Sequence, residues 1–204
     1  MRSHLRRFRS TYSVAAVALA TAGMVAAGAT PATATTYLYN VTGSTAPGGA
    51  FTGSSPHPVF KNAGYADVLS CATASFSGSM PNVTNSAGAI GTFSGYTFSQ
   101  CTLPSGPSAT VTATVHPATL TVTGGETVSG TLPVGTLSLA VNASSCSYTL
   151  TQASPLSWQV NRGSAFQSLV TFTPENVKGS CGLIAPIVFA HGGTIQPNVT
   201  SHPA

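Results

Sequence analysis

The sequence contains very few charged residues. Of its 204 residues, seven are Lys or Arg and three are Asp or Glu, which gives a formal net charge of +4. Four of the basic residues, Arg2, Arg6, Arg7 and Arg9, lie within the first nine positions. From Thr35 onward the chain has three charged residues of each sign and a formal net charge of zero. About a quarter of an ordinary soluble domain is charged, so this chain is depleted in the groups that recognise ionic partners.

This shortage of charge excludes several classes of partner. Nucleic-acid binding requires Lys and Arg to neutralise phosphates, and beyond the first nine positions only Lys61, Arg162 and Lys178 are present. The same shortage argues against contact with an anionic membrane surface and against electrostatic steering of a ligand. We therefore expect no nucleic-acid partner.

Carboxylates are equally scarce, since Asp67, Glu126 and Glu175 are the only three in the chain. A glycosidase needs two carboxylates facing each other across a sugar, and none of these three lies in a motif that indicates such a pair. A Ser nucleophile would need a His base and an orienting acid, but the G-x-S-x-G motif is missing. We expect no catalytic residues and no enzymatic activity.

Metal-binding motifs are also missing. The sequence has no C-x-x-C or C-x-x-H spacing, which argues against zinc and iron–sulfur sites. A copper site would place His, Cys and Met in one compact loop, whereas the histidines after residue 34 are dispersed: His57, His116, His191 and His202. We expect no metal and no other cofactor.

The first 34 residues have the layout of a secretory signal peptide. A cationic start is followed by an apolar stretch (residues 14–29), and Ala32-Thr33-Ala34 forms a small-x-small cleavage site. An uncleaved membrane anchor is the alternative, but the apolar stretch contains two glycines and is short for a span of roughly 20 residues. Arg9 occupies a position that is usually apolar in twin-arginine signals. We expect general secretion, cleavage after Ala34 and an extracellular location.

Hydroxyl residues supply most of the polarity after Ala34, where Ser and Thr make up 48 of 170 residues. In residues 109–115, Ala and Val alternate with Thr, which indicates a strand with a Thr-bearing solvent face. The same period recurs at 119–123 and 137–141. Further strand candidates are residues 68–76, 90–98, 128–132, 146–151, 156–160, 168–172 and 183–190.

These short strands, separated by Gly, Pro, Asn and Ser, predict an all-β fold: an antiparallel β-sandwich, Ig-like or barrel-like. We expect this domain to span residues 66–196. Glycines and prolines interrupt any apolar rhythm at 35–65, which predicts an irregular arm with one strand at 37–42, or a disordered spacer. Residues 197–204 have the composition of a frayed tail.

The four cysteines, Cys71, Cys101, Cys146 and Cys181, are an even number in a chain that we expect to be exported, which predicts two disulfides. Three connectivities are open. We favour the pairs Cys71–Cys101 and Cys146–Cys181, because each pair then encloses a similar block of strands.

Aromatic residues offer one candidate ligand site. Trp158 is the single tryptophan, and with Tyr148 and Phe166 it could line a pocket for a small molecule or a sugar ring. The alternative is a structural role, because Trp158 alternates with Leu156 and Val160 as a core residue of a strand would.

The leader is rich in Arg and Ala, and short segments with a shared character surround the cysteines: Leu69-Ser70-Cys71, Gly91-Thr92-Phe93, Phe98-Ser99-Gln100-Cys101, Ser145-Cys146 and Gly179-Ser180-Cys181-Gly182-Leu183. Together these features resemble small secreted four-cysteine β proteins common in high-GC Gram-positive bacteria. The resemblance covers about residues 68–195. It implies export, disulfides and an all-β fold, and it transfers no functional residue.

Three functions remain open. The leading one is a non-catalytic protein of the cell envelope or extracellular surface, because uncharged Thr-faced strands can self-associate or contact other surfaces without Coulomb repulsion. The first alternative is a module that binds a small molecule or glycan through Trp158, Tyr148 and Phe166. The second alternative is a secreted protease inhibitor that presents residues 103–107, the loop after Cys101.

Overall fold

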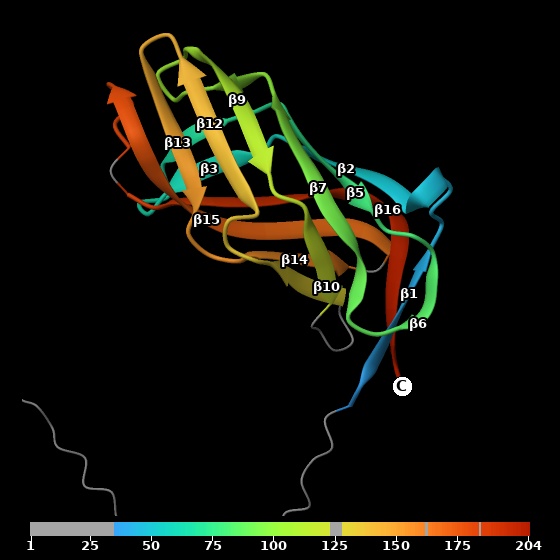
Figure 1. The fold of residues 1–204 in the computed structure, drawn as a ribbon. Helices are drawn as coiled ribbons and strands as arrows, with labels where there is room; N and C mark the ends of the chain where they lie inside the picture. The colour runs from blue at the N-terminus through green and yellow to red at the C-terminus, as the bar shows by residue number, and fades with distance from the viewer. Residues whose placement is uncertain (1–34, 123–127, 162, 184) are drawn as a thin grey trace, which may run out of the picture. The chain divides into compact units, whose positions relative to one another are not determined.

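The computed structural model describes residues 35–122, 128–161, 163–183 and 185–204. The expected signal peptide (residues 1–34) lies outside the described residues, as do Glu126 and Arg162. The described chain is built almost entirely of antiparallel strands, which confirms the predicted all-β class (Figure 1). The elements are β1 (Tyr37–Thr42), η1 (Pro47–Gly49), β2 (Ala50–Pro56), β3 (Val59–Asn62), β4 (Asp67–Ser70), β5 (Thr73–Ser79), β6 (Val83–Ser86), β7 (Ala89–Ser99), β8 (Cys101–Thr102), β9 (Ser108–Val115), β10 (Ala118–Val122), β11 (Val128–Leu132), β12 (Leu137–Ala143), β13 (Cys146–Gln152), β14 (Leu156–Asn161), β15 (Gly163–Gly179) and β16 (Ile187–Pro203).

The strands with the clearest alternation lie where the sequence predicts them. β9 and β12 pair in continuous register from Leu137↔Val115 to Ala143↔Ala109, and β11 coincides with the expected strand at 128–132. The expected strand at 68–76 is instead two strands, β4 and β5, separated at Cys71 and Ala72. The chain changes partner at this point, since β4 pairs with β3 whereas β5 pairs with β2.

The one strand expected within the arm at 35–65 is confirmed, since β1 spans 37–42, but the rest of the arm is not irregular and contains two further strands, β2 and β3. β2 alternates regularly between exposed and buried residues, but two of its three buried positions are Gly53 and Ser55. Gly53 is required there, because a Cβ atom would lie 2.1 Å from the ring of Phe76. The inward face of β2 therefore lacks the alternating apolar residues by which a strand is recognised in a sequence.

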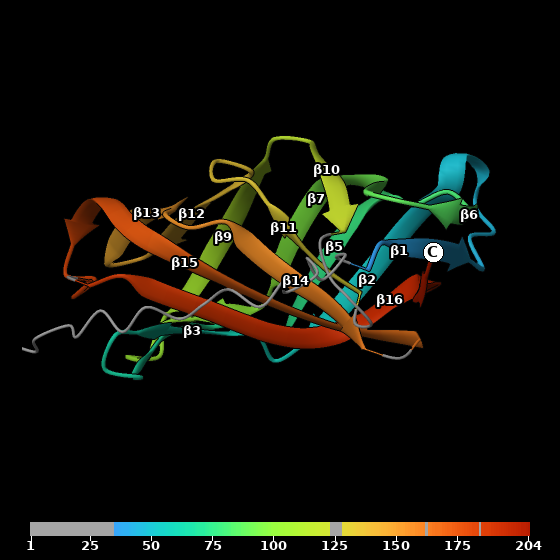
Figure 2. The ribbon, with the colours of Figure 1, turned by 90° about the horizontal axis from the view of Figure 1, so that it is seen from below.

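The expected frayed tail at 197–204 is also structured, because β16 continues to Pro203. The last part of β16 pairs with every residue of β1, from Thr42↔Asn198 to Tyr37↔Pro203. β15 and β16 are 17 residues each and pair with one another. Figure 2 shows these two strands side by side along most of their length.

The strand pairings close into two circuits that share β15 and β16. The first circuit runs through β2, β5, β7, β10, β11, β14, β15 and β16, and back to β2. The second runs through β15, β13, β12, β9, β8, β4, β3 and β16. A closed circuit leaves few unpaired strand edges. Among the described strands, β6 is an open edge, a four-residue strand that pairs with β1 across a register shift. Residues 95–99 of β7 and 110–115 of β9 also have a strand partner on one side only.

One continuous apolar core fills the interior of both circuits. Aromatic rings connect the two halves, with Tyr96 stacked on Phe98 at a centroid distance of 4.9 Å and Phe98 tilted against Phe60 at 5.5 Å. Phe60 is itself stacked on Phe189 at 4.2 Å.

Both favoured disulfides are present, Cys71–Cys101 and Cys146–Cys181. The first joins the end of β4 to the start of β8, strands whose ladder consists of the single pair Ser70↔Thr102. It therefore supports the weakest junction of the second circuit. Two disulfides are typical of proteins that work in an oxidising, extracellular environment.

No helix within the described ranges is long and apolar enough to span a membrane.

Candidate functional site

A broad hollow of about 690 Å³ lies on the outer face of β11, β14, β15 and β16. We call it the outer groove and define it by its outward-facing residues: Ser129, Thr131, Ser157, Gln159, Gln167, Leu169, Ala190 and Gly192. None of these eight side chains is charged.

The strand register places these residues in two parallel rows. Gln159 lies between Ser129 and Gln167, and Gln167 lies beside Gly192. In the second row, two residues further along each strand, Thr131, Ser157, Leu169 and Ala190 lie next to one another in that order. Successive residues of a strand point to opposite faces, so both rows face solvent while the row between them faces the core.

The groove offers hydrogen-bonding groups together with one apolar contact. Its two glutamine amides can each donate and accept, and its three hydroxyl groups can do the same. The Ser157 hydroxyl already donates to the backbone carbonyl of Leu169 at 3.2 Å. The Leu169 side chain is 48% exposed, whereas Ala190 and Gly192 contribute little bulk and leave the β16 side of the groove open.

The inward-facing row behind the groove consists of Gly130, Trp158, Ser168 and His191, which are register neighbours on the same four strands. All four are buried. Gly130 makes room for the indole, because a Cβ atom there would lie 2.7 Å from the Trp158 ring. Trp158 therefore has the core position that its alternation with Leu156 and Val160 indicates.

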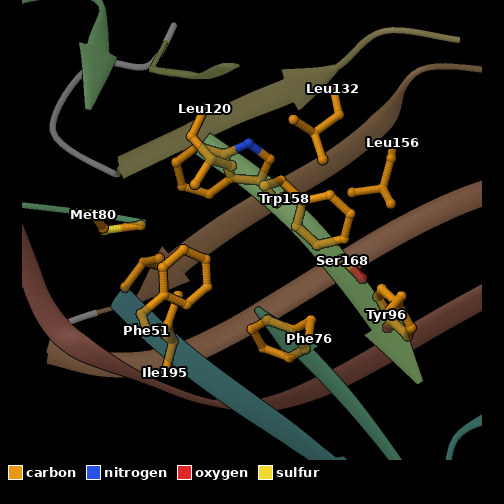
Figure 3. Close-up of a pocket in the computed structure, with 12 residues that line it drawn as sticks. Phe51, Phe76, Met80, Tyr96, Leu120, Leu132, Leu156, Trp158, Ser168 and Ile195 are labelled. Atoms are coloured by element: carbon orange, nitrogen blue, oxygen red, sulfur yellow. The ribbon is translucent and has the colours of Figure 1, made fainter. Parts of the chain in front are cut away.

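Trp158 also lines an internal cavity of about 20 Å³ in the first circuit, together with Phe51, Phe76 and Ile195 (Figure 3). A cavity needs roughly 10–15 Å³ to hold one water molecule, so this one is of about the size of a water site. Trp158 Nε1 and Ser168 Oγ are buried and have no hydrogen-bond partner in the described part of the chain.

A hydrogen bond joins the Tyr96 hydroxyl to His191 Nε2 beside this cavity. Burial lowers the pKa of His191 to about 4 and raises the pKa of Tyr96 well above its ordinary value. Both groups are therefore neutral at physiological pH. His191 also stacks on Phe189 at a centroid distance of 4.6 Å, so its ring is packed as part of the core.

The other ionisable residues that the structure describes do not converge on a reactive centre. Asp67 forms an ion pair with Lys61 at 3.0 Å. His57 and His116 are exposed. Among the described residues no group of three or more His, Cys, Asp or Glu side chains is placed to hold a metal ion.

The structure does not place the three predicted ligand residues around one cavity. Tyr148 lies on β13 in the second circuit, is buried and is not part of the lining around Trp158. Burial raises the pKa of Tyr148 to about 12. The backbone of Phe166 pairs with Val160 and Gly193, and its side chain lies outside the described residues.

The loop proposed for protease inhibition is a tight turn. The Leu103 N–H donates to the Pro107 carbonyl at 3.0 Å, and the Gly106 N–H donates to the Leu103 carbonyl at 2.9 Å. The Leu103 side chain is buried, so the turn does not present its one large apolar residue to a protease.

One exposed aromatic residue was not singled out from the sequence. Tyr65 lies in the turn between β3 and β4, is 83% exposed and has a backbone φ of +63°. The Asn62 side chain holds this turn, since its Oδ1 atom accepts from the N–H groups of Gly64 and Ala66. The Asn-Ala-Gly segment was the available signal, because Asn and Gly favour turns.

The chain matches none of the protein-family models, curated proteins or solved structures with which it was compared.

Proposed function

We propose that this chain is a secreted, non-catalytic protein that acts in the cell envelope or on the extracellular surface through the uncharged outer faces of its strands. The observation that carries the proposal is the outer groove, a hollow of about 690 Å³ whose side chains are hydroxyl, amide and aliphatic groups. Such a surface binds by hydrogen bonds and shape and carries no charge for an ionic partner to recognise.

The position of the outer groove supports binding through a face. The two strands at its centre, β14 and β15, are each paired on both sides along the groove. The open strand edges, at β6 and at residues 95–99 of β7 and 110–115 of β9, lie on strands that do not form the groove. We therefore assign the interaction to strand faces.

Export is part of the same proposal, with general secretion and removal of residues 1–34. Mass spectrometry of the protein from culture medium and envelope should show a chain that begins at Thr35. A chain that retains residue 1 would contradict export with cleavage.

Fractionation of a producing culture tests the proposed location. We expect most of the mature chain to sediment with isolated envelopes and to stay bound when salt is raised from about 0.1 M to about 1 M, which shortens the Debye length from about 10 Å to about 3 Å. Free release into the medium, combined with a strictly monomeric state at high protein concentration, would contradict the proposal.

A second candidate, a module for a small molecule that carries a hydrogen-bonding group, is favoured by the unpartnered polar atoms of Trp158 and Ser168, two residues that line the internal cavity. At about 20 Å³ the cavity must enlarge before it can hold more than water. Titration of the purified protein with small-molecule extracts, followed by Trp158 fluorescence, tests this candidate. An emission spectrum that no extract shifts or quenches would reject it.

A further inference from the structure

We infer that the outer groove binds a neutral polysaccharide. This inference rests on the proposed function and names its ligand. The groove is formed where four strands meet in one register, and its two outward rows bring together residues from distant parts of the sequence, such as Thr131, Gln167 and Ala190.

The dimensions of the groove suit a segment of polymer. Three inter-strand spacings of about 4.8 Å give roughly 14 Å across β11, β14, β15 and β16, and two residues along a strand add about 7 Å. Its volume of about 690 Å³ falls in the usual range of ligand sites, roughly 300–1,000 Å³. The ligand therefore lies across the four strands, on the open outer surface of the sheet.

The side chains select for a ligand that is rich in hydroxyl groups. Gln159 and Gln167 are direct cross-strand neighbours at the centre of the groove, and each amide offers both donors and an acceptor. Sugar hydroxyls also donate and accept, so they can form hydrogen bonds with either kind of group. The exposed Leu169 side chain supplies an apolar contact for the C–H face of a sugar ring.

The absence of charge among the groove side chains decides against anionic polysaccharides. A carboxylate or sulfate group would lose water on binding and find no Lys or Arg partner among the described residues of the groove. A neutral chain avoids this loss.

The position of the groove decides against an extended peptide. Peptides commonly bind sheets by adding a strand to an exposed edge. β14 and β15 at the centre of the groove are paired on both sides, β14 with β11 and β15, and β15 with β14 and β16. No backbone edge is open to a peptide there.

The test uses the mature chain labelled with ¹⁵N and titrated separately with maltohexaose, cellohexaose and chitohexaose. We expect at least one neutral oligosaccharide to shift the backbone amide resonances of the groove strands. An anionic oligogalacturonate and a neutral peptide serve as comparisons and should leave these resonances unchanged. No response to any neutral sugar, a response on other strands, or a response to a comparison ligand alone would each overturn the inference.

Two variants locate the site. The double substitution Gln159→Ala/Gln167→Ala removes both central amides and should weaken binding about tenfold or more. Ala190→Tyr fills the open side of the groove and should abolish binding. The three substituted positions are exposed or half-buried and do not contribute to the core. The matched control is Gln196→Ala, an exposed amide on β16 outside the groove, which should change affinity less than twofold. Wild-type affinity in both groove variants would overturn the inference.

Envelope sedimentation of the same variants separates this inference from the proposed function. If wild type and groove variants are retained equally, the polysaccharide site is wrong while the envelope location stands. If wild type is not retained at all, the proposed function is wrong.

Discussion

At the scale of single residues, the most informative group is His191, which is buried as a neutral ring against Tyr96 and Phe189. Desolvation lowers its pKa to about 4, because water no longer stabilises the charged imidazolium. In the unfolded chain the same imidazole has an ordinary pKa near 6.5. The native state therefore resists protonation that the unfolded state accepts.

This difference predicts acid sensitivity. Between about pH 6.5 and pH 4 the unfolded chain binds a proton that the native chain does not, so the free energy of unfolding falls as pH falls through that window. The loss attributable to His191 is of the order of 3 kcal/mol. Urea unfolding at several pH values measures this loss of unfolding free energy.

The double variant Tyr96→Phe/His191→Phe should flatten this pH dependence, because both polar partners are removed together. His116→Gln, at an exposed position, is the control and should retain the wild-type slope. Equal slopes in wild type and double variant would show that another group causes the acid sensitivity.

Tyr65 gives a second prediction at the residue scale. Its φ of +63° is unfavourable for a bulky L-residue by roughly 1–2 kcal/mol, whereas Asn tolerates this conformation. Tyr65→Asn should therefore raise the free energy of unfolding by about 0.5–1 kcal/mol, as measured by chemical denaturation. Tyr65→Ala keeps the Cβ constraint and should give no such gain. If both variants have equal stability, backbone strain at residue 65 is not the cause.

At the scale of elements, the sequence predicts strands well where their inward positions are apolar. β9 and β12 follow Ala/Val and Leu/Val alternation and lie where expected. β2 was missed because Gly53 and Ser55 occupy inward positions, and the extended β16 was missed because His191 and Gly193 interrupt its apolar period. The residue types at these inward positions are determined by packing against aromatic rings and backbone from distant parts of the chain, and a local sequence pattern does not reveal that packing.

Gly53 shows this constraint directly. A Cβ atom at residue 53 would lie 2.1 Å from the Phe76 ring and 2.8 Å from the Thr194 carbonyl oxygen. Gly53→Ala should therefore lower the free energy of unfolding by about 1–3 kcal/mol, the usual cost of overpacking. Gly64→Ala, where the nearest atom is the Asn62 side-chain oxygen at 3.4 Å, is the matched control. A thermal melt of both variants checks the difference, and equal melting temperatures would contradict the packing argument.

The Cys71–Cys101 disulfide supports an element junction that has little other support, the single β4–β8 pair Ser70↔Thr102. Cys71→Ser/Cys101→Ser should lower the free energy of unfolding by about 3–4 kcal/mol on the loop-entropy model. Hydrogen exchange should accelerate first in β3, β4 and β8. The matched comparison is Cys146→Ser/Cys181→Ser, whose fastest exchange should instead lie at the β13–β15 end. An indistinguishable exchange pattern in the two variants would contradict this assignment.

At the scale of the whole molecule, the strand circuits explain why the outer groove could not be predicted from sequence. Its residues lie on strands up to about sixty positions apart, and only the register that closes the first circuit aligns them. The sequence does indicate the chemistry of the surface, because a chain with few charges and abundant Ser and Thr has mainly uncharged polar groups to present. Composition therefore predicts the kind of surface, and long-range pairing determines its place.

The most direct test of the account is binding of the purified mature chain to isolated envelopes, measured for wild type, Gln159→Ala/Gln167→Ala and Gln196→Ala at low and high salt. The account predicts binding of wild type and Gln196→Ala that is unchanged between about 0.1 M and about 1 M salt. It also predicts binding about tenfold weaker for the groove variant. Wild-type binding that disappears at high salt, or that the groove variant retains in full, would contradict it.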